Sequence, residues 1–263
     1  MEALEQVDGW PAEHVAVGVA GTAEATHGET ERVFPWASVT KLASAVAVLV
    51  AVEEGLVDLD EPAGPPGSSV RHLLSHASGL PFERGAPISR PGIRRVYSNH
   101  GFDVLADFVA GRAEMPFADY FGHVWQPGPV LKGHAGSGAE GTLADALELA
   151  RELLAPRRIA PETLAEATSV QFPGLMGVLP SYGRQDPNDW GLGIELRDSK
   201  SPHWTGTRNS PRTCGHFGRS GTFVWVDPEP GLALACLTDL EFGDWAREAW
   251  PRLSDAVLAE VQG

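Results

Sequence analysis

The most hydrophobic stretch of the chain is residues 42–52, in which Ser44 is the one polar residue. An apolar run of this length is too short to cross a bilayer and is typical of a buried helix. We expect the helix to span Ser38 to Glu54, since Gly55 follows in the position where helices commonly end. A buried helix near the start of the chain therefore forms the centre of the predicted fold.

Strand patterns lie towards the two ends of the chain. Near the start, residues 14–20 and 24–27 are separated by a Gly-Thr break and predict a β-hairpin. Late in the chain, short apolar runs bounded by turn residues predict four strands, with a turn at 227–231 before the last one. These four are Trp190–Leu196, Thr213–Phe217, Thr222–Val226 and Leu232–Thr238.

Helical patterns fill the middle of the chain and follow the last strand. Residues 2–9 are expected to form a short helix and residues 244–261 an amphipathic one. In the middle, segments rich in Pro and Gly separate five short helices at Val70–His76, Gly101–Ala113, Phe117–Val124, Leu143–Leu154 and Pro161–Thr168. This order predicts an α+β protein whose antiparallel sheet, built from both chain ends, is flanked by N- and C-terminal helices and interrupted by an all-helical lobe.

We expect a single domain over residues 1–263, made of two lobes. Residues 1–55 and 183–263 would form the α/β lobe, and residues 56–182 the helical lobe. A chain of 263 residues can bury a sizeable core. Its 43% hydrophobic and 21% charged content is that of an ordinary globular protein.

Charge and cysteine content narrow the class of protein. The formal net charge of −15 argues against nucleic acid and anionic membrane surfaces as partners. The acidic N-terminus lacks an apolar signal core, which predicts a cytoplasmic protein. Cys214 and Cys236 are too few for a disulfide framework. We expect them on strands to either side of residues 222–226, roughly 10 Å apart and beyond disulfide reach.

Ser38 and Lys41 stand three residues apart at the start of the apolar helix, in the sequence WASVTK. Residues i and i+3 share a helix face, so the hydroxyl and the amine can meet. Only three of the 20 basic residues are lysines, and a lysine among apolar neighbours tends to lose its proton. A neutral amine can activate a serine for nucleophilic attack. Taken alone, the pair also fits an N-capping serine followed by a lysine that reaches for solvent.

Two further segments, RVYSNH and CGHFGRSGT, carry polar side chains of possible catalytic use. Tyr97 precedes a predicted helix and can act as base or proton relay where a cation lowers its pKa. The amide of Asn99 can hold a lysine and a substrate carbonyl. On a predicted strand, His216 offers a polar or cationic group and Gly218 leaves room for a ligand backbone. The structural alternatives are an Asn-capped helix and a glycine-rich hairpin with a surface histidine.

In their order along the chain, the three segments resemble the motifs of the serine β-lactamase/penicillin-recognising superfamily, which are Ser-x-x-Lys, Tyr-x-Asn and Lys/His-x-Gly. The likeness is greatest to its branch of class C β-lactamase-related esterases and D-peptidases. Supporting likenesses are LLSHASGL at 73–80, GTLAD at 141–145 with glycine for serine, WGLG at 190–193 and WVDP at 225–228. The resemblance covers nearly the whole chain. It implies a serine β-lactamase-like fold, and we expect neither a metal nor a cofactor.

The resemblance implies a serine hydrolase that forms an acyl-enzyme with a small-molecule ester, amide or β-lactam-like substrate. Ser38 would be the nucleophile. Lys41 and Tyr97 would share the proton transfer, and which of them is the base stays open. Asn99 would orient the lysine and the acyl group, and His216 would support the tyrosine or the polar end of the substrate.

The remaining binding groups are expected on and beside the third segment. The oxyanion hole would combine the backbone N–H of Ser38 with that of Arg219, which directly follows Gly218. Phe217 would line the cleft and favour acyl or aryl groups. Tryptophans in segments that should border the cleft would join it, namely Trp36, Trp190 and Trp204.

Departures from the family pattern shape the expected activity. His216 stands where β-lactamases usually have lysine, and no Glu-x-x-Leu-Asn segment is present. The histidine favours the esterase/peptidase side, and the missing segment leaves the class A deacylation glutamate without a counterpart. We expect β-lactamase activity to be weak or absent. The alternatives are an acyltransferase of the same fold and a penicillin-binding or sensor protein with little turnover. The physiological substrate and the oligomeric state stay open.

Two other site types are disfavoured by the sequence. His72 and His76 lie four apart, but the glutamate of a zinc protease motif is missing, so a hydrogen bond at the helix end is expected for His76. No Gly-x-Ser-x-Gly occurs, which argues against an α/β-hydrolase.

Overall fold

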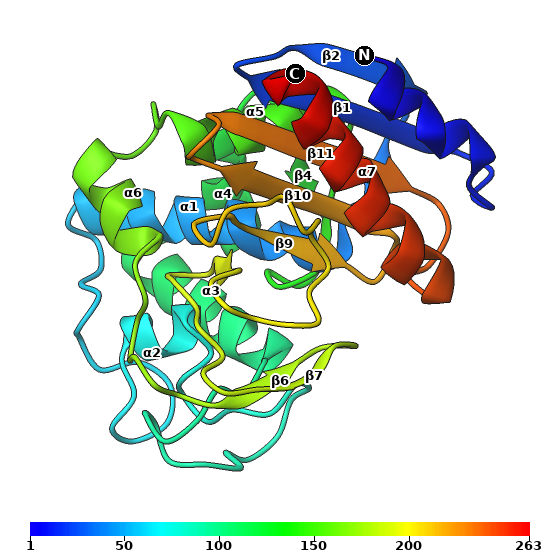
Figure 1. Ribbon diagram of the computed structural model, residues 1–263. Coiled ribbons are helices and arrows are strands. Elements are labelled where there is room, and N and C mark those ends of the chain that lie inside the picture. Colours follow the sequence, from blue (N-terminus) through cyan, green and yellow to red (C-terminus); the bar gives the residue numbers. More distant parts are fainter.

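A six-stranded antiparallel sheet organises the molecule. The computed structural model describes residues 1–263, and the strand order in this sheet is β2-β1-β11-β10-β9-β8. The strands are β1 Val15–Gly21, β2 Ala25–Gly28, β8 Glu195–Leu196, β9 Cys214–Gly218, β10 Thr222–Asp227 and β11 Leu232–Thr238. Pairing of β1 with β11 joins the two ends of the chain, as the sequence predicts, and Figure 1 shows the blue and orange strands side by side.

Helices cover both faces of the sheet (Figure 1). The helices are η1 Glu2–Gly9, η2 Ala37–Val39, α1 Thr40–Glu53, α2 Val70–Leu74, α3 Asn99–Ala113, α4 Phe117–Trp125, α5 Leu143–Leu154, α6 Pro161–Ala167 and α7 Asp244–Gln262. On one face, Phe223 of β10 packs against Trp250 of α7, with ring centroids 4.9 Å apart. On the other face, α5 contacts β1, β10 and β11. Alternate side chains of each strand therefore enter two separate hydrophobic cores.

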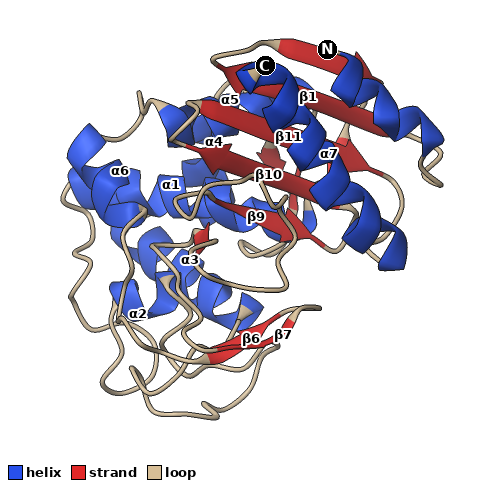
Figure 2. Cartoon of the chain, in the orientation of Figure 1, coloured by secondary structure: helices blue, strands red, loops and turns tan.

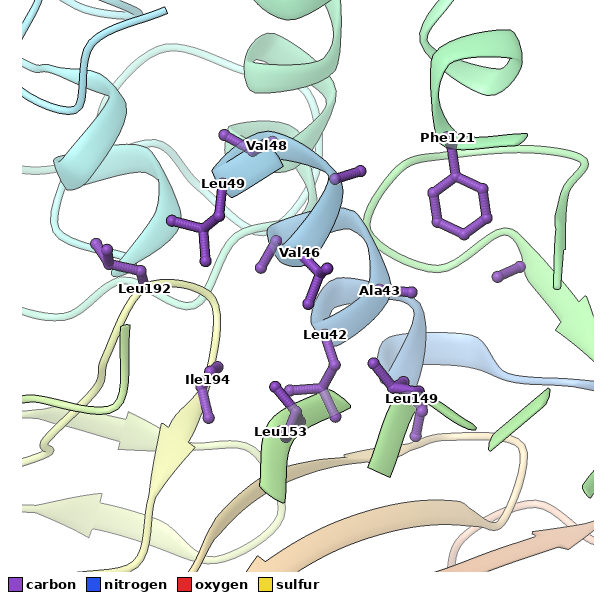
Figure 3. Close-up of a cluster of buried hydrophobic side chains, with 14 of the residues drawn as sticks. Leu42, Ala43, Val46, Val48, Leu49, Phe121, Leu149, Leu153, Leu192 and Ile194 are labelled. Atoms are coloured by element: carbon purple, nitrogen blue, oxygen red, sulfur yellow. The ribbon is translucent and has the colours of Figure 1, made fainter. Parts of the chain in front are cut away.

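Helix α1 lies at the centre of the larger core. It begins at Thr40, with the 3-10 turn η2 before it, and it is apolar on all sides, which is the pattern of a fully buried helix. Figure 3 shows Leu42 facing Leu153 of α5, while Leu192 and Ile194 approach from the chain before β8. This burial fixes the position of the residues at the N-terminal end of the helix.

The segment between α1 and β8 carries most of the remaining helices and several short strands (Figure 2). The strands of this segment are β4 Val130–Leu131, β5 Ala139–Gly141, β6 Gly177–Leu179 and β7 Gly183–Gln185, while β3 Phe34–Pro35 lies just before η2. They form a three-stranded sheet, β3-β5-β4, and a hairpin, β6-β7. The inserted part is therefore mixed rather than all helical, and its helix α5 packs on the main sheet.

The predicted strand over Trp190–Leu196 is wrong for its first five residues. Only Glu195 and Leu196 join β8. The N–H of Gly191 bonds to the carbonyl of Ile194, and Gly193 has a φ of 75°, so the chain turns here instead of extending. The turn brings the ring of Trp190 towards the site described below.

The predicted placement of the two cysteines is confirmed. Cys214 lies on β9 and Cys236 on β11, with β10 between them, and both thiols are free and buried. No helix combines the length and the apolar character needed to cross a membrane.

Candidate active site

Ser38 lies in the 3-10 turn η2, directly before the buried helix α1. The residue before it, Ala37, has a φ of 45°, which is the left-handed region and a strained conformation for a residue with a Cβ. The turn contacts β9 and β10. The Ser38 hydroxyl is thus presented from a rigid, packed element, at the edge of a cavity.

Lys41 is completely buried one turn further along. Its Nζ donates to Oδ1 of Asn99 at 2.5 Å and to the carbonyl oxygen of Gly136 at 2.7 Å. Neither of these two acceptors carries a charge. Burial therefore lowers the pKa of Lys41 from 10.5 to about 7, and the charge of Asp103 opposes that fall. A lysine with this pKa is in large part a neutral amine at pH 7 to 8.

Tyr97 connects the lysine to the third predicted motif. Nζ of Lys41 lies 4.7 Å from the centroid of the Tyr97 ring, and the phenol oxygen is 3.3 Å from Nε2 of His216. Burial raises the pKa of Tyr97 above its usual value, and the Ser38 side chain acts in the opposite direction. The phenol therefore keeps its proton at neutral pH.

The start of α3 holds Tyr97 and Asn99 in place. The hydroxyl of Ser98 caps this helix by accepting from the N–H of Gly101 at 2.8 Å. The N–H of Ser98 donates to Nδ1 of His76 at 3.2 Å. The imidazole of His76 also packs on the Tyr97 ring, with centroids 4.7 Å apart. His76 is thus bound to the start of α3, while Nδ1 of His72 contacts the hydroxyl of Ser69.

His216 is buried on β9, and both ring nitrogens have protein neighbours. Nδ1 lies 2.7 Å from the carbonyl oxygen of Phe217, so this nitrogen carries the hydrogen and Nε2 is the acceptor towards Tyr97. Burial, together with the charge of Lys41, lowers the pKa of His216 to about 3. His216 is therefore a neutral hydrogen-bond acceptor rather than a cation.

Gly218 has a different role from the one its motif indicates. A Cβ at this position would lie 2.5 Å from the carbonyl oxygen of Trp36 and 2.5 Å from Oγ1 of Thr222. The turn that carries Ser38 fills this space, so the missing side chain leaves no room for a ligand here. The next backbone N–H, that of Arg219, makes no hydrogen bond within the protein. It is therefore available as an oxyanion donor beside Ser38.

A cavity of about 250 Å³ opens beside Ser38. Tyr97, Phe217 and Arg219 also border it, as does the tryptophan of the turn before β8. The full lining is Ser38, Phe82, Tyr97, Leu179, Pro180, Ser181, Trp190, Glu195, His216, Phe217, Arg219 and Phe242. Of the three tryptophans expected at the cleft, Trp190 lines this cavity, whereas Trp36 and Trp204 do not border it.

A second, more polar cavity of about 590 Å³ lies on the other side of Phe82. Phe82 borders both cavities, and Asn99 borders the polar one. Its other lining residues are Glu83, Arg84, His100, Asp103, Val104, Asp107 and His134. The residues around Ser38 thus separate an aromatic compartment from an acidic one.

The structure adds site residues that the motifs do not include. The Gly136 carbonyl and Asp103 act on Lys41 from the loop before β5 and from α3, respectively. Glu195 lines the aromatic cavity and binds a buried amine, that of Lys200. The glycine-rich run around Gly136 is the one sequence signal for these contacts. The contacts of Asp103 and Glu195 depend on tertiary packing and have no such signal.

The comparisons with known proteins agree with this geometry. The family model described as Beta-lactamase matches residues 3–128 and 122–259, nearly the whole chain. Among curated proteins, no sequence matches. A solved structure of a β-lactamase from Mycobacterium bovis is 54% identical in sequence, with a TM-score of 0.96, and 98% of this chain and 99% of that one are covered.

More distant structures share the fold. EstCE1, described as a hydrolase with promiscuous acyltransferase activity, has a TM-score of 0.78 at 18% identity, covering 97% of this chain and 96% of its own. Unliganded simvastatin synthase from Aspergillus terreus has a TM-score of 0.79 at 16% identity, covering 100% and 98%. From the family match and the relative in Mycobacterium bovis, the chain belongs to the Beta-lactamase family.

Proposed function

We propose that the protein is a serine hydrolase that cleaves small acyl or aryl esters, or related amides, through an acyl-enzyme on Ser38. The observation that carries the proposal is the buried amine of Lys41, with a pKa of about 7, one helical turn from a serine that opens onto an aromatic cavity. A neutral amine in this position can take the proton of the attacking hydroxyl.

The protonation states of the two side chains favour Lys41 over Tyr97 as the base. At pH 7 to 8 a large share of Lys41 is neutral, whereas Tyr97 is protonated because burial raises its pKa. The Ser38 oxygen would bond to the substrate carbonyl carbon as its proton passes to Lys41. The resulting oxyanion would accept from the N–H of Ser38 and of Arg219. The proton then passes to the leaving oxygen or nitrogen, and water releases the acyl group by the reverse sequence.

Replacing the nucleophile tests this proposal. In Ser38→Ala, hydrolysis of a short-chain para-nitrophenyl ester should fall roughly a thousandfold or more. A fluorophosphonate should add to the wild-type protein, seen by intact-protein mass, and not to Ser38→Ala. Ser44→Ala is the matched control, because Ser44 lies on α1, the helix that follows Ser38, but is buried and donates to the carbonyl of Ala135. Full turnover by Ser38→Ala would overturn the proposal.

Acyl transfer is the second candidate, favoured by the polar cavity that adjoins Asn99 on the far side of Phe82. An alcohol or amine held there could take the acyl group in place of water. EstCE1, which shares the fold, is described as having acyltransferase activity. Ester incubated with candidate alcohols and amines should then give transfer products at the expense of free acid. A penicillin-binding or sensor role would instead leave Ser38 labelled without release.

A further inference from the structure

The cavity at Ser38 lacks a cation that is free to bind a substrate carboxylate. Its lining includes one carboxylate, Glu195, and two groups that could bear positive charge, His216 and Arg219. Both ring nitrogens of His216 have protein partners, and the guanidinium of Arg219 is exposed at the rim, where Glu241 lies 3.5 Å away. The charge balance around the nucleophile is therefore a property of this site that the proposed function does not specify.

His216 cannot donate to an anion in this arrangement. Its Nδ1–H is held by the carbonyl of Phe217, and its Nε2 accepts from the hydroxyl of Tyr97. A substrate carboxylate would meet a ring without a free donor. A second proton on the ring would also have to enter a buried position close to the amine of Lys41.

The buried lysine behind the cavity wall is also fully engaged. Nζ of Lys200 donates to Glu195 and to the backbone carbonyls of Asp189 and Leu196, which uses all three of its N–H groups. Glu195 additionally bonds to His203 at 2.9 Å and to the indole N–H of Trp204 at 2.9 Å. Glu195 borders the cavity with its charge compensated by Lys200, and the pair offers no spare ammonium to a substrate.

Acidic groups dominate the rim. The guanidinium of Arg219 is 83% exposed and has Glu241 3.5 Å away. Across Phe82, the polar cavity contributes the carboxylates of Glu83, Asp103 and Asp107 and one guanidinium. These carboxylates belong to a chain with a net charge of −15, which disfavours the approach of an anionic substrate.

Resting on the proposed function, we propose that the site accepts uncharged or cationic acyl esters and rejects esters that carry a carboxylate near the reacting carbonyl. Penicillins bear a carboxylate next to the lactam ring and fall in the rejected class. The selection is electrostatic and acts as the substrate enters the site, before Ser38 attacks.

Three para-nitrophenyl esters of matched shape test the selection. They share a butyryl chain that ends in a tert-butyl, a trimethylammonium or a carboxylate group. We expect kcat/KM for the carboxylate ester to be at least about tenfold below that of the tert-butyl ester, and that of the trimethylammonium ester to equal or exceed the neutral one. Added salt should narrow the gap between the two charged esters.

A cation placed at the rim should relax the selection. Ser181 borders the cavity with an exposed side chain. Relative to Ser181→Gln, which places a neutral side chain of similar length at the same position, Ser181→Lys should raise the ratio of kcat/KM for the carboxylate ester to kcat/KM for the neutral ester about fivefold or more. Glu241→Gln, which frees Arg219, should act in the same direction.

The outcomes separate the two proposals. If the three esters react alike through Ser38, or if Ser181→Lys gives no gain for the carboxylate ester, charge selection is overturned and the hydrolase proposal stands. If none of the three esters acylates Ser38, both are overturned.

Discussion

At the scale of single residues, the three lysines of the chain show how the surroundings set their chemistry. Lys132 is exposed and pairs with Glu140 at 2.7 Å. Lys200 is buried against a carboxylate, which keeps the pKa of Glu195 at about 2. Lys41 is buried with only neutral acceptors, and its pKa falls to about 7. Burial without a counter-charge therefore makes Lys41 the one suited to act as a base.

The pH dependence of turnover should report this amine. Because the neutral form of Lys41 is active, kcat/KM should rise with pH through about 7. The charge of Asp103 raises the pKa of Lys41, so Asp103→Asn should move the rise to lower pH by roughly half a unit, equivalent to ~0.7 kcal/mol. Asp107→Asn, one turn further along α3, is the control and should leave the midpoint in place. An upward movement in Asp103→Asn would contradict the assignment of Lys41 as the base.

The same shift affects stability with a definite sign. Between about 7 and 10.5, Lys41 holds a proton in the unfolded chain and largely lacks it in the folded protein. The free energy of unfolding therefore increases as the pH rises across this window.

At the scale of secondary-structure elements, the decisive contact is between β9 and the turn η2. It brings the backbone N–H of Arg219, the proposed oxyanion donor, to the same cavity as Ser38, and Gly218 permits the approach because any Cβ there would meet Trp36 and Thr222. The third motif is therefore needed for packing as well as for its polar side chain.

Gly218→Ala should separate these two elements. The added methyl group has no room, so we expect a loss of about 1–3 kcal/mol in the free energy of unfolding and at least a tenfold fall in kcat/KM. Gly122→Ala in α4, where a Cβ meets nothing within 4 Å, is the matched control. It should be stabilising by about 0.5–1 kcal/mol without a change in kcat/KM. Unaltered turnover by Gly218→Ala would mean that the approach is not needed.

Most elements could be predicted because their signals are local. The bounds of α5 and β11 match the sequence prediction, since apolar period and turn residues mark both ends. The stretch before β8 is predicted wrongly, because Trp190–Ile194 alternates large apolar residues with glycine, and these same glycines permit the turn that forms instead. In the site, Ser38, Lys41, Tyr97 and His216 follow from motifs. The Gly136 carbonyl and Glu195 do not, because their roles depend on segments far apart in sequence.

At the scale of the whole molecule, the buried pair of Lys200 and Glu195 supports the wall of the aromatic cavity from behind. It lies next to the turn at Trp190 and the short strand β8. Taking one partner away leaves the other charge buried without compensation, whereas replacing both leaves neutral groups.

Unfolding in urea should distinguish these two cases. Lys200→Met should lower the free energy of unfolding by about 3–5 kcal/mol. The double variant Lys200→Met/Glu195→Gln should recover part of that loss, since the amide oxygen can still accept from Trp204. A single variant within 1 kcal/mol of wild type would show that the pair contributes little.

The pairing of β1 with β11 has a consequence for synthesis of the protein. Val15 lies opposite Thr238, so a ribosome must translate nearly the entire message before the early strand gains its neighbour. Until then, the edge of β1 that pairs with β11 stays unpaired and the apolar helix α1 is not fully buried. Chains in this state are prone to self-association. We therefore expect nascent chains of this architecture to need protection during elongation, and the proposed activity to arise only after β9 and β11 have left the exit tunnel.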